Sequence, residues 1–270
     1  METEDTIQSE QPTNEMEELS HTDKIVGVIS EPSNLFSKLA FQSSKVTDWL
    51  LPLFTMIIVS IIATFIYMSN PEIKLEMQQQ QKKAMQEQFD KMVESGQLSR
   101  EQADEQMDKT MEVMGSSGMM QIFSSIGILV MMLLWFFVFT TIAFLIARFA
   151  FKGDGTYTQA MSAMGLPFYI SVLQSIILII LGLLMGKMLT GLNPTALLGM
   201  DIKTLPGFLL SRFDVFSIWF YVVVGIAFAK MFKSNNVKKY IFTSIGLWLV
   251  FMFIIFGLAK VSPTFGNMLR

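Results

Sequence analysis

The sequence predicts an all-α, polytopic membrane protein with five transmembrane helices and an extramembrane helical hairpin between the first and second. Hydrophobic residues make up 51% of the 270 positions, whereas charged residues make up only 16%, against about 25% in typical soluble domains. The mean hydropathy is +0.47. Charge-free apolar windows also recur along the chain, each near the length of about 20 residues that a helix needs to cross the hydrocarbon layer.

The charges are divided unevenly along the chain. Residues 1–23 hold eight acidic residues and no Lys or Arg, and they show almost no apolar periodicity. Because such a segment buries too little apolar surface to offset the entropy of ordering, we expect residues 1–24 to form a disordered acidic tail. Two roles remain open for this tail, a solvated segment or a partner-binding segment.

Residues 25–48 are interpreted as an interfacial pre-membrane segment. The stretch IVGVIS predicts a short extended piece, and Pro32 favours the start of a helix. In that helix Leu35, Phe36 and Leu39 share one face, which we expect to enter the lipid while lysines meet the headgroups. A plain linker helix is the alternative.

Five apolar windows predict the membrane domain, residues 49–261, which a short tail at 262–270 follows. The windows are 49–71, 119–147, 155–186, 215–229 and 240–259. The fourth has only 15 residues, so it must extend into its flanks, and a re-entrant fourth segment would move the C-terminus to the other side. Lys and Arg in the short loops favour a cytoplasmic N-terminus and an outer C-terminus.

Two connections carry local structure signals. Residues 72–114 are rich in helix formers with one interruption at Ser95 and Gly96, and Ser99 with Gln102 fits a capping box, so a helical hairpin is predicted. Residues 187–211 fit an outer interfacial loop with a short helix from Pro194. A re-entrant pore loop is the alternative.

Most catalytic chemistry is missing from the sequence. There is no Cys, and the single His, His21, lies in the acidic tail. Thiol nucleophiles, Cys-ligated metals, Ser–His hydrolysis in the membrane and the H-E-x-x-H motif are therefore excluded, and no phosphate-binding Gly-rich loop is visible. We expect no enzymatic activity, no cofactor, no metal site and no nucleic-acid partner.

Polar residues are few inside the predicted spans. Gln174 falls midway along the third span, and no charged residue falls near a predicted midplane, which argues against ion coupling. Asp214 precedes the fourth span, where we expect it to pair with Arg212 or a loop cation. Small residues spaced four apart, such as Gly225 and Ala229, favour close helix packing or self-association.

Four stretches resemble the Yip family, the Ypt/Rab-interacting membrane domain, in its bacterial branch. They are IVGVISEPSNLFSKL at 25–39, FKGDGTYTQAMSAMGLPFYI at 151–170, LSRFDVFSIWFYVVVGIAF at 210–228 and KKYIFTSIGLWLVFMF at 238–253. The resemblance implies five spans with a cytoplasmic N-terminus. The family-like positions are Pro32, Gly155, Pro167, Asp214 and Trp219. Because the Asp-Leu-Tyr-Gly-Pro motif of eukaryotic members is absent, Rab binding is not implied.

These observations favour a non-enzymatic membrane scaffold in a bacterial cytoplasmic membrane. Its expected partners are the lipid bilayer, other membrane proteins, and a second copy of the chain through small-residue helix faces. The alternative is a small-solute transporter or channel built around Gln174, Asp214 and the loop at 187–211.

Overall fold

A computed structural model describes residues 18–116, 118–189 and 191–261 of the chain, with side chains for 18–111, 129–189 and 191–260. The described residues form helices and no strand. In order the elements are α1 (His21–Ser30), α2 (Pro32–Leu39), α3 (Thr47–Ser69), α4 (Pro71–Glu94), α5 (Arg100–Ser116), α6 (Gly118–Leu145), the π-helical turn η1 (Ile146–Ala150), α7 (Tyr157–Gly165), α8 (Phe168–Met185), α9 (Pro194–Leu198), α10 (Leu205–Ser211), α11 (Val215–Met231) and α12 (Val237–Val261).

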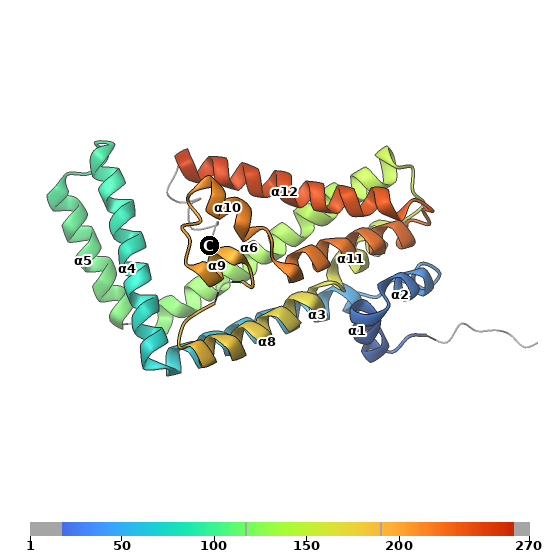
Figure 1. The fold of residues 1–270 in the computed structure, drawn as a ribbon, viewed down its shortest axis with the longest axis horizontal. Coiled ribbons are helices and arrows are strands. Elements are labelled where there is room, and N and C mark those ends of the chain that lie inside the picture. Colours follow the sequence, from blue (N-terminus) through green and yellow to red (C-terminus); the bar gives the residue numbers. More distant parts are fainter. Residues whose placement is uncertain (1–17, 117, 190, 262–270) are drawn as a thin grey trace, which may run out of the picture.

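The predicted spans correspond to helices of the right length. Four segments are long and apolar enough to cross a membrane, namely Thr47–Ser69, Leu129–Ala150, Tyr157–Met185 and Val237–Lys260. Helices α10 and α11 meet the same length and hydropathy criteria only when taken together, and the 60° bend between them fits a broken fifth span or a re-entrant loop. In Figure 1 successive spans run in alternating directions along one bundle, with α1 and α2 at one end and α4 and α5 at the other.

Helix α11 lies at the centre of the bundle, which explains why its sequence is apolar on all sides. It packs against α2, α7, α8 and α12, and eight of its 17 residues are buried. A helix enclosed by protein is apolar on all sides. Its 17 residues rise about 25 Å, which is less than the hydrocarbon thickness of about 30 Å, and the bent α10 lies at the unfilled end.

Helices α11 and α12 approach each other closely because Gly225 has no side chain. A Cβ on Gly225 would lie 2.4 Å from the Cα of Ile241, and Ala229 of the same face is fully buried. Gly182 similarly faces the ring of Tyr67 on α3. These small-residue faces are therefore occupied inside one chain, and a second copy would have to compete with that packing.

The start of the chain differs from its expected structure. Residues 25–30 are helical rather than extended, and α1 begins at His21, inside the segment expected to be disordered. Side chains Leu35, Phe36 and Leu39, which were expected to enter lipid, are buried in the protein core where α2 packs against α11. Apolar periodicity identifies a face to be buried, but it does not say whether lipid or protein covers it.

Local signals in the two long connections are matched by the structure. Helix α4 ends at Glu94, and Gly96 adopts a φ of 73° that favours glycine. The Ser99 hydroxyl accepts from the Gln102 amide at 3.2 Å, and the Gln102 side chain accepts from the Ser99 amide at 3.0 Å. Helices α4 and α5 lie side by side (Figure 1). In the second connection α9 begins at Pro194, as predicted.

Candidate functional site

A polar cavity of about 800 Å³ opens where α4, α8, α10, α11 and α12 meet the loop at 187–204. Its lining includes both residues of the alternative transporter site, Gln174 and Asp214, which lie 40 positions apart in the sequence. The Nε2 of Gln174 donates to both carboxylate oxygens of Asp214, at 3.1 and 3.0 Å. The structure therefore brings these two predicted residues into direct contact.

The Asp214 carboxylate is buried, with 3% of the residue exposed, and backbone amides surround it. Asp214 is the N-cap of α11, and its Oδ1 accepts from the amides of Phe216 at 2.9 Å and Ser217 at 3.0 Å. Its Oδ2 accepts from the amide of Leu192 at 2.8 Å. Because helix N-termini favour negative charge, these donors satisfy the carboxylate without a cation.

The expected ion pair of Asp214 with Arg212 or a loop cation is wrong, because Asp214 forms no ion pair with the described residues. The Arg212 guanidinium instead donates to the Ser211 hydroxyl at 3.0 and 2.8 Å and to the Met252 sulfur at 2.9 Å. It also lies 5.0 Å from the centre of the Phe208 ring. Side chains two residues apart at a helix start point in different directions, so sequence proximity did not predict spatial proximity.

The depth of this site also differs from the sequence-based expectation. Gln174 lies eleven residues before the end of α8, which corresponds to about 16 Å along the helix axis. Asp214 contacts Gln174 and therefore lies within the depth of the span, although no charge was expected there. The argument against ion coupling, which relied on that expectation, is weakened accordingly.

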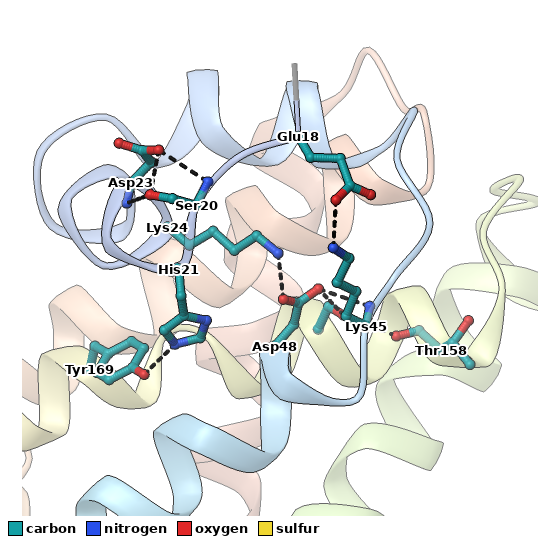
Figure 2. Close-up of polar contacts among 10 residues, drawn as sticks. Glu18, Ser20, His21, Asp23, Lys24, Lys45, Asp48, Thr158 and Tyr169 are labelled. Atoms are coloured by element: carbon teal, nitrogen blue, oxygen red, sulfur yellow. Dashed lines mark hydrogen bonds and ion pairs between the residues drawn. The ribbon is translucent and has the colours of Figure 1, made fainter. Parts of the chain in front are cut away.

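A second polar cluster holds α1 against the opposite end of the bundle (Figure 2). The Lys24 ammonium lies 2.6 Å from the Asp48 carboxylate at the start of α3, with side-chain exposures of 5% and 1%. Asp48 also accepts from the Lys45 amide at 3.0 Å and from the Ser162 hydroxyl of α7 at 3.5 Å. Sequence reasoning missed this pair, although a carboxylate directly before an apolar span was a signal that could have found it.

His21 belongs to the same cluster rather than to a solvated tail. Its Nε2 lies 2.6 Å from the Tyr169 hydroxyl on α8 (Figure 2). Burial lowers the pKa of His21 below its usual 6.5, and the positive charge of Lys24 lowers it further, while Asp48 acts in the opposite direction. His21 is therefore predominantly neutral at pH 7. In the described part of the chain, no group of three or more His, Asp or Glu residues could hold a metal ion.

The remaining family-like positions do not converge on one site. Pro32 is the first residue of α2, as predicted. Gly155 leaves room for Phe232, whose ring atoms would lie 2.7 Å from an added Cβ. Pro167 is the N-cap of α8 at the break after α7, and Trp219 packs near Phe216 on α11. Each has a local packing or helix-boundary explanation, and any functional role for these positions stays a prediction.

Taken together, the spans define the chain as a multi-pass α-helical membrane protein with a cavity where the bundle meets α4 and the loop before α10. Comparison with protein families identifies it further, because the Yip1 domain matches residues 26–258, from α1 to the last turns of α12. The chain therefore belongs to the Yip1 domain family. Comparison with curated proteins and with solved structures gave no match.

Proposed function

We propose that this Yip1-domain protein is a non-enzymatic scaffold that organises other membrane proteins. The proposal places it in a bacterial cytoplasmic membrane with the N-terminus inside and the C-terminus outside. It assigns residues 25–48 to the pre-membrane segment, 49–261 to the membrane domain and 72–114 to an inserted hairpin outside the bilayer.

The observation that carries the proposal is the extension of α4 and α5 away from the spans (Figure 1). The 24 residues of α4 correspond to about 36 Å, and most of its side chains are exposed or half-buried. The two helices pack on each other, and the side chains of Glu87 and Lys203 form an ion pair between α4 and the loop before α10. A charged arm of this kind, which extends beyond the spans, suits contacts with other proteins.

Site-specific photo-crosslinking in native membranes tests the scaffold. A photoreactive residue at Gln106, which is exposed on α5, is expected to form adducts with other membrane proteins. The same residue at Phe65, which is 71% exposed on α3, is the control and is expected to form lipid adducts. Identical adducts at both positions, or an unchanged partner list after removal of both the acidic tail and residues 72–114, would reject the proposal.

The cavity favours a second candidate, a small-solute transporter or channel using Gln174, Asp214 and the loop at 187–211. The cavity lining on α11 ends at Ser217, and the next buried side chains of that helix, Phe220 and Val223, belong to the apolar core. Transport would therefore require these helices to move. Absence of solute flux in reconstituted vesicles would reject this candidate, and flux unaffected by Asp214→Asn and Gln174→Ala would reject these residues as its site.

A further inference from the structure

Arg212 places a positive charge within the apolar depth of the bundle. Its guanidinium contacts Met252, which lies seven residues before the end of the charge-free stretch 240–259 of α12. Seven residues correspond to about 10 Å along the helix axis. Instead of extending toward the headgroups, this guanidinium contacts the Ser211 hydroxyl, the Met252 thioether and the Phe208 ring.

The surroundings of Arg212 satisfy its hydrogen bonds only in part and leave its charge unpaired. The Ser211 hydroxyl accepts two of its five N–H groups, and the Met252 sulfur, a weak acceptor, accepts a third. Across the residues with described side chains, Arg212 forms no ion pair. Intramembrane charges are costly unless paired or hydrated, so a charge retained here points to an anionic ligand.

A second cation lines the same cavity. Lys187 follows the end of α8, is half-buried, and likewise has no ion-pair partner in the described ranges. Lys187 lies two residues after the end of α8, and Arg212 directly follows the end of α10. The two cations therefore lie at the ends of two different helices, α8 and α10, among the elements that line the cavity.

The carboxylates that line the cavity are engaged elsewhere. Asp214 is saturated by Gln174 and three backbone amides. Glu87 pairs with Lys203, and Asp201 accepts from the Lys203 amide at 2.8 Å. Glu76 accepts from Gln80 at 3.1 Å. None of these groups forms an ion pair with Arg212, so its guanidinium charge is unpaired within the described residues, although acidic and basic side chains both line the cavity.

We propose that this cavity binds a phosphate group, with Arg212 and Lys187 as its cationic ligands. The planar guanidinium donates to two phosphate oxygens at once, and a lysine ammonium reaches a third. A volume of about 800 Å³ lies within the range of roughly 300 to 1,000 Å³ that small-molecule sites occupy. The phosphate is that of a lipid headgroup entering from the leaflet or of a water-soluble molecule.

This inference stands apart from the scaffold and from transport. Binding of a phosphate requires neither a protein partner nor movement of a solute across the bilayer. A negative crosslinking or flux experiment therefore leaves the phosphate site standing, and a negative binding experiment leaves the scaffold standing.

Calorimetric titration of the purified full chain in detergent tests the site. The probes are dihexanoyl phosphatidylglycerol and sodium phosphate, with dihexanoyl glycerol, which lacks phosphate, and sodium chloride of equal ionic strength as blanks. We expect at least one phosphate probe to bind and neither blank to do so. Arg212→Gln should weaken binding at least about 10-fold and Lys187→Gln about 3-fold, because each removes charge-assisted hydrogen bonds.

The matched control is Arg148→Gln, which removes an exposed arginine that pairs with Asp154 at the other end of the bundle. This variant should bind as the unaltered chain does. Binding of the lipid probe alone assigns the leaflet as the source, whereas binding of sodium phosphate assigns a soluble molecule. If Arg212→Gln loses its cooperative thermal unfolding, the affinity of Lys187→Gln for the phosphate probes tests the site instead. Failure of both phosphate probes to bind, or unchanged affinity in the folded variants, overturns the proposal.

Discussion

Removing the Lys24 ammonium should detach α1 and α2 from the bundle. The Lys24 Nζ and Asp48 Oδ1 atoms lie 2.6 Å apart, and both side chains are almost fully buried (Figure 2). With an effective dielectric constant of about 20, Coulomb's law gives about 6 kcal/mol of attraction at that separation. Desolvation offsets part of this attraction, but Lys24→Met would leave the Asp48 carboxylate buried and unpaired, which costs about 3 to 5 kcal/mol.

Hydrogen exchange of the backbone amides in residues 21–39 measures this loss directly. A change of 3 to 5 kcal/mol corresponds to roughly a 100- to 4,000-fold decrease in protection. Adding Asp48→Asn to Lys24→Met should restore much of the protection, because asparagine removes the charge and keeps an acceptor for the Lys45 amide.

The control for this experiment is Lys45→Met. Lys45 also forms an ion pair in this cluster, with Glu18, but the two side chains are 49% and 71% exposed. Exposed pairs contribute about 1 kcal/mol or less, so protection should fall less than about 10-fold. Equal losses in Lys24→Met and Lys45→Met, or a double variant no better protected than Lys24→Met alone, would show that burial of the charge is not what holds α1 and α2.

Three further predictions concern packing, pH and orientation. Gly225→Ala should force α11 and α12 apart and destabilise the bundle by about 1 to 3 kcal/mol in thermal unfolding. Gly246→Ala is the control, because its added Cβ would meet open space. Equal melting temperatures for the two variants would count against the tight contact between α11 and α12. Burial lowers the pKa of His21 in the folded chain, so as pH falls the unfolded chain binds a proton before the folded chain does. Hydrogen-exchange protection of α1 should therefore be full above pH 6.5 and decline below it. This pH dependence should disappear in His21→Gln. Since the chain has no cysteine, Ser95→Cys and Asn235→Cys can be labelled selectively in intact cells, and an impermeant maleimide should reach position 95 but not position 235.

Local signals in the sequence predicted where the helices begin and end. Pro32, Ser99 and Pro194 marked helix starts because their geometry or capping acts within a few residues. The apolar windows predicted the spans because bilayer thickness determines the number of residues in a crossing. Both kinds of signal require only neighbouring residues.

Tertiary contacts account for what the sequence did not predict. Phe36 has the same apolar character whether lipid or α11 covers it, so hydropathy placed it in lipid although it is completely buried in protein. The partner of Asp214 proved to be Gln174, a distant residue on a neighbouring span, rather than the adjacent Arg212. The Lys24–Asp48 pair similarly joins residues that composition assigned to a disordered tail and to the end of the pre-membrane segment.

The short fourth span and the polar cavity have one physical cause. Because α11 rises only about 25 Å, its N-terminus lies below the end of the neighbouring α8 and α12. Its orphan amides must be satisfied at that depth, and Asp214 satisfies two of them and accepts from Gln174 as well. Helix α10, which precedes α11 in the chain, is bent from it by 60°. Arg212, at the end of α10, therefore occupies the space that a longer α11 would have filled. A full-length apolar helix at this position would remove both the charge and the cavity, so the same shortness that made the span hard to identify in the sequence produces the polar site.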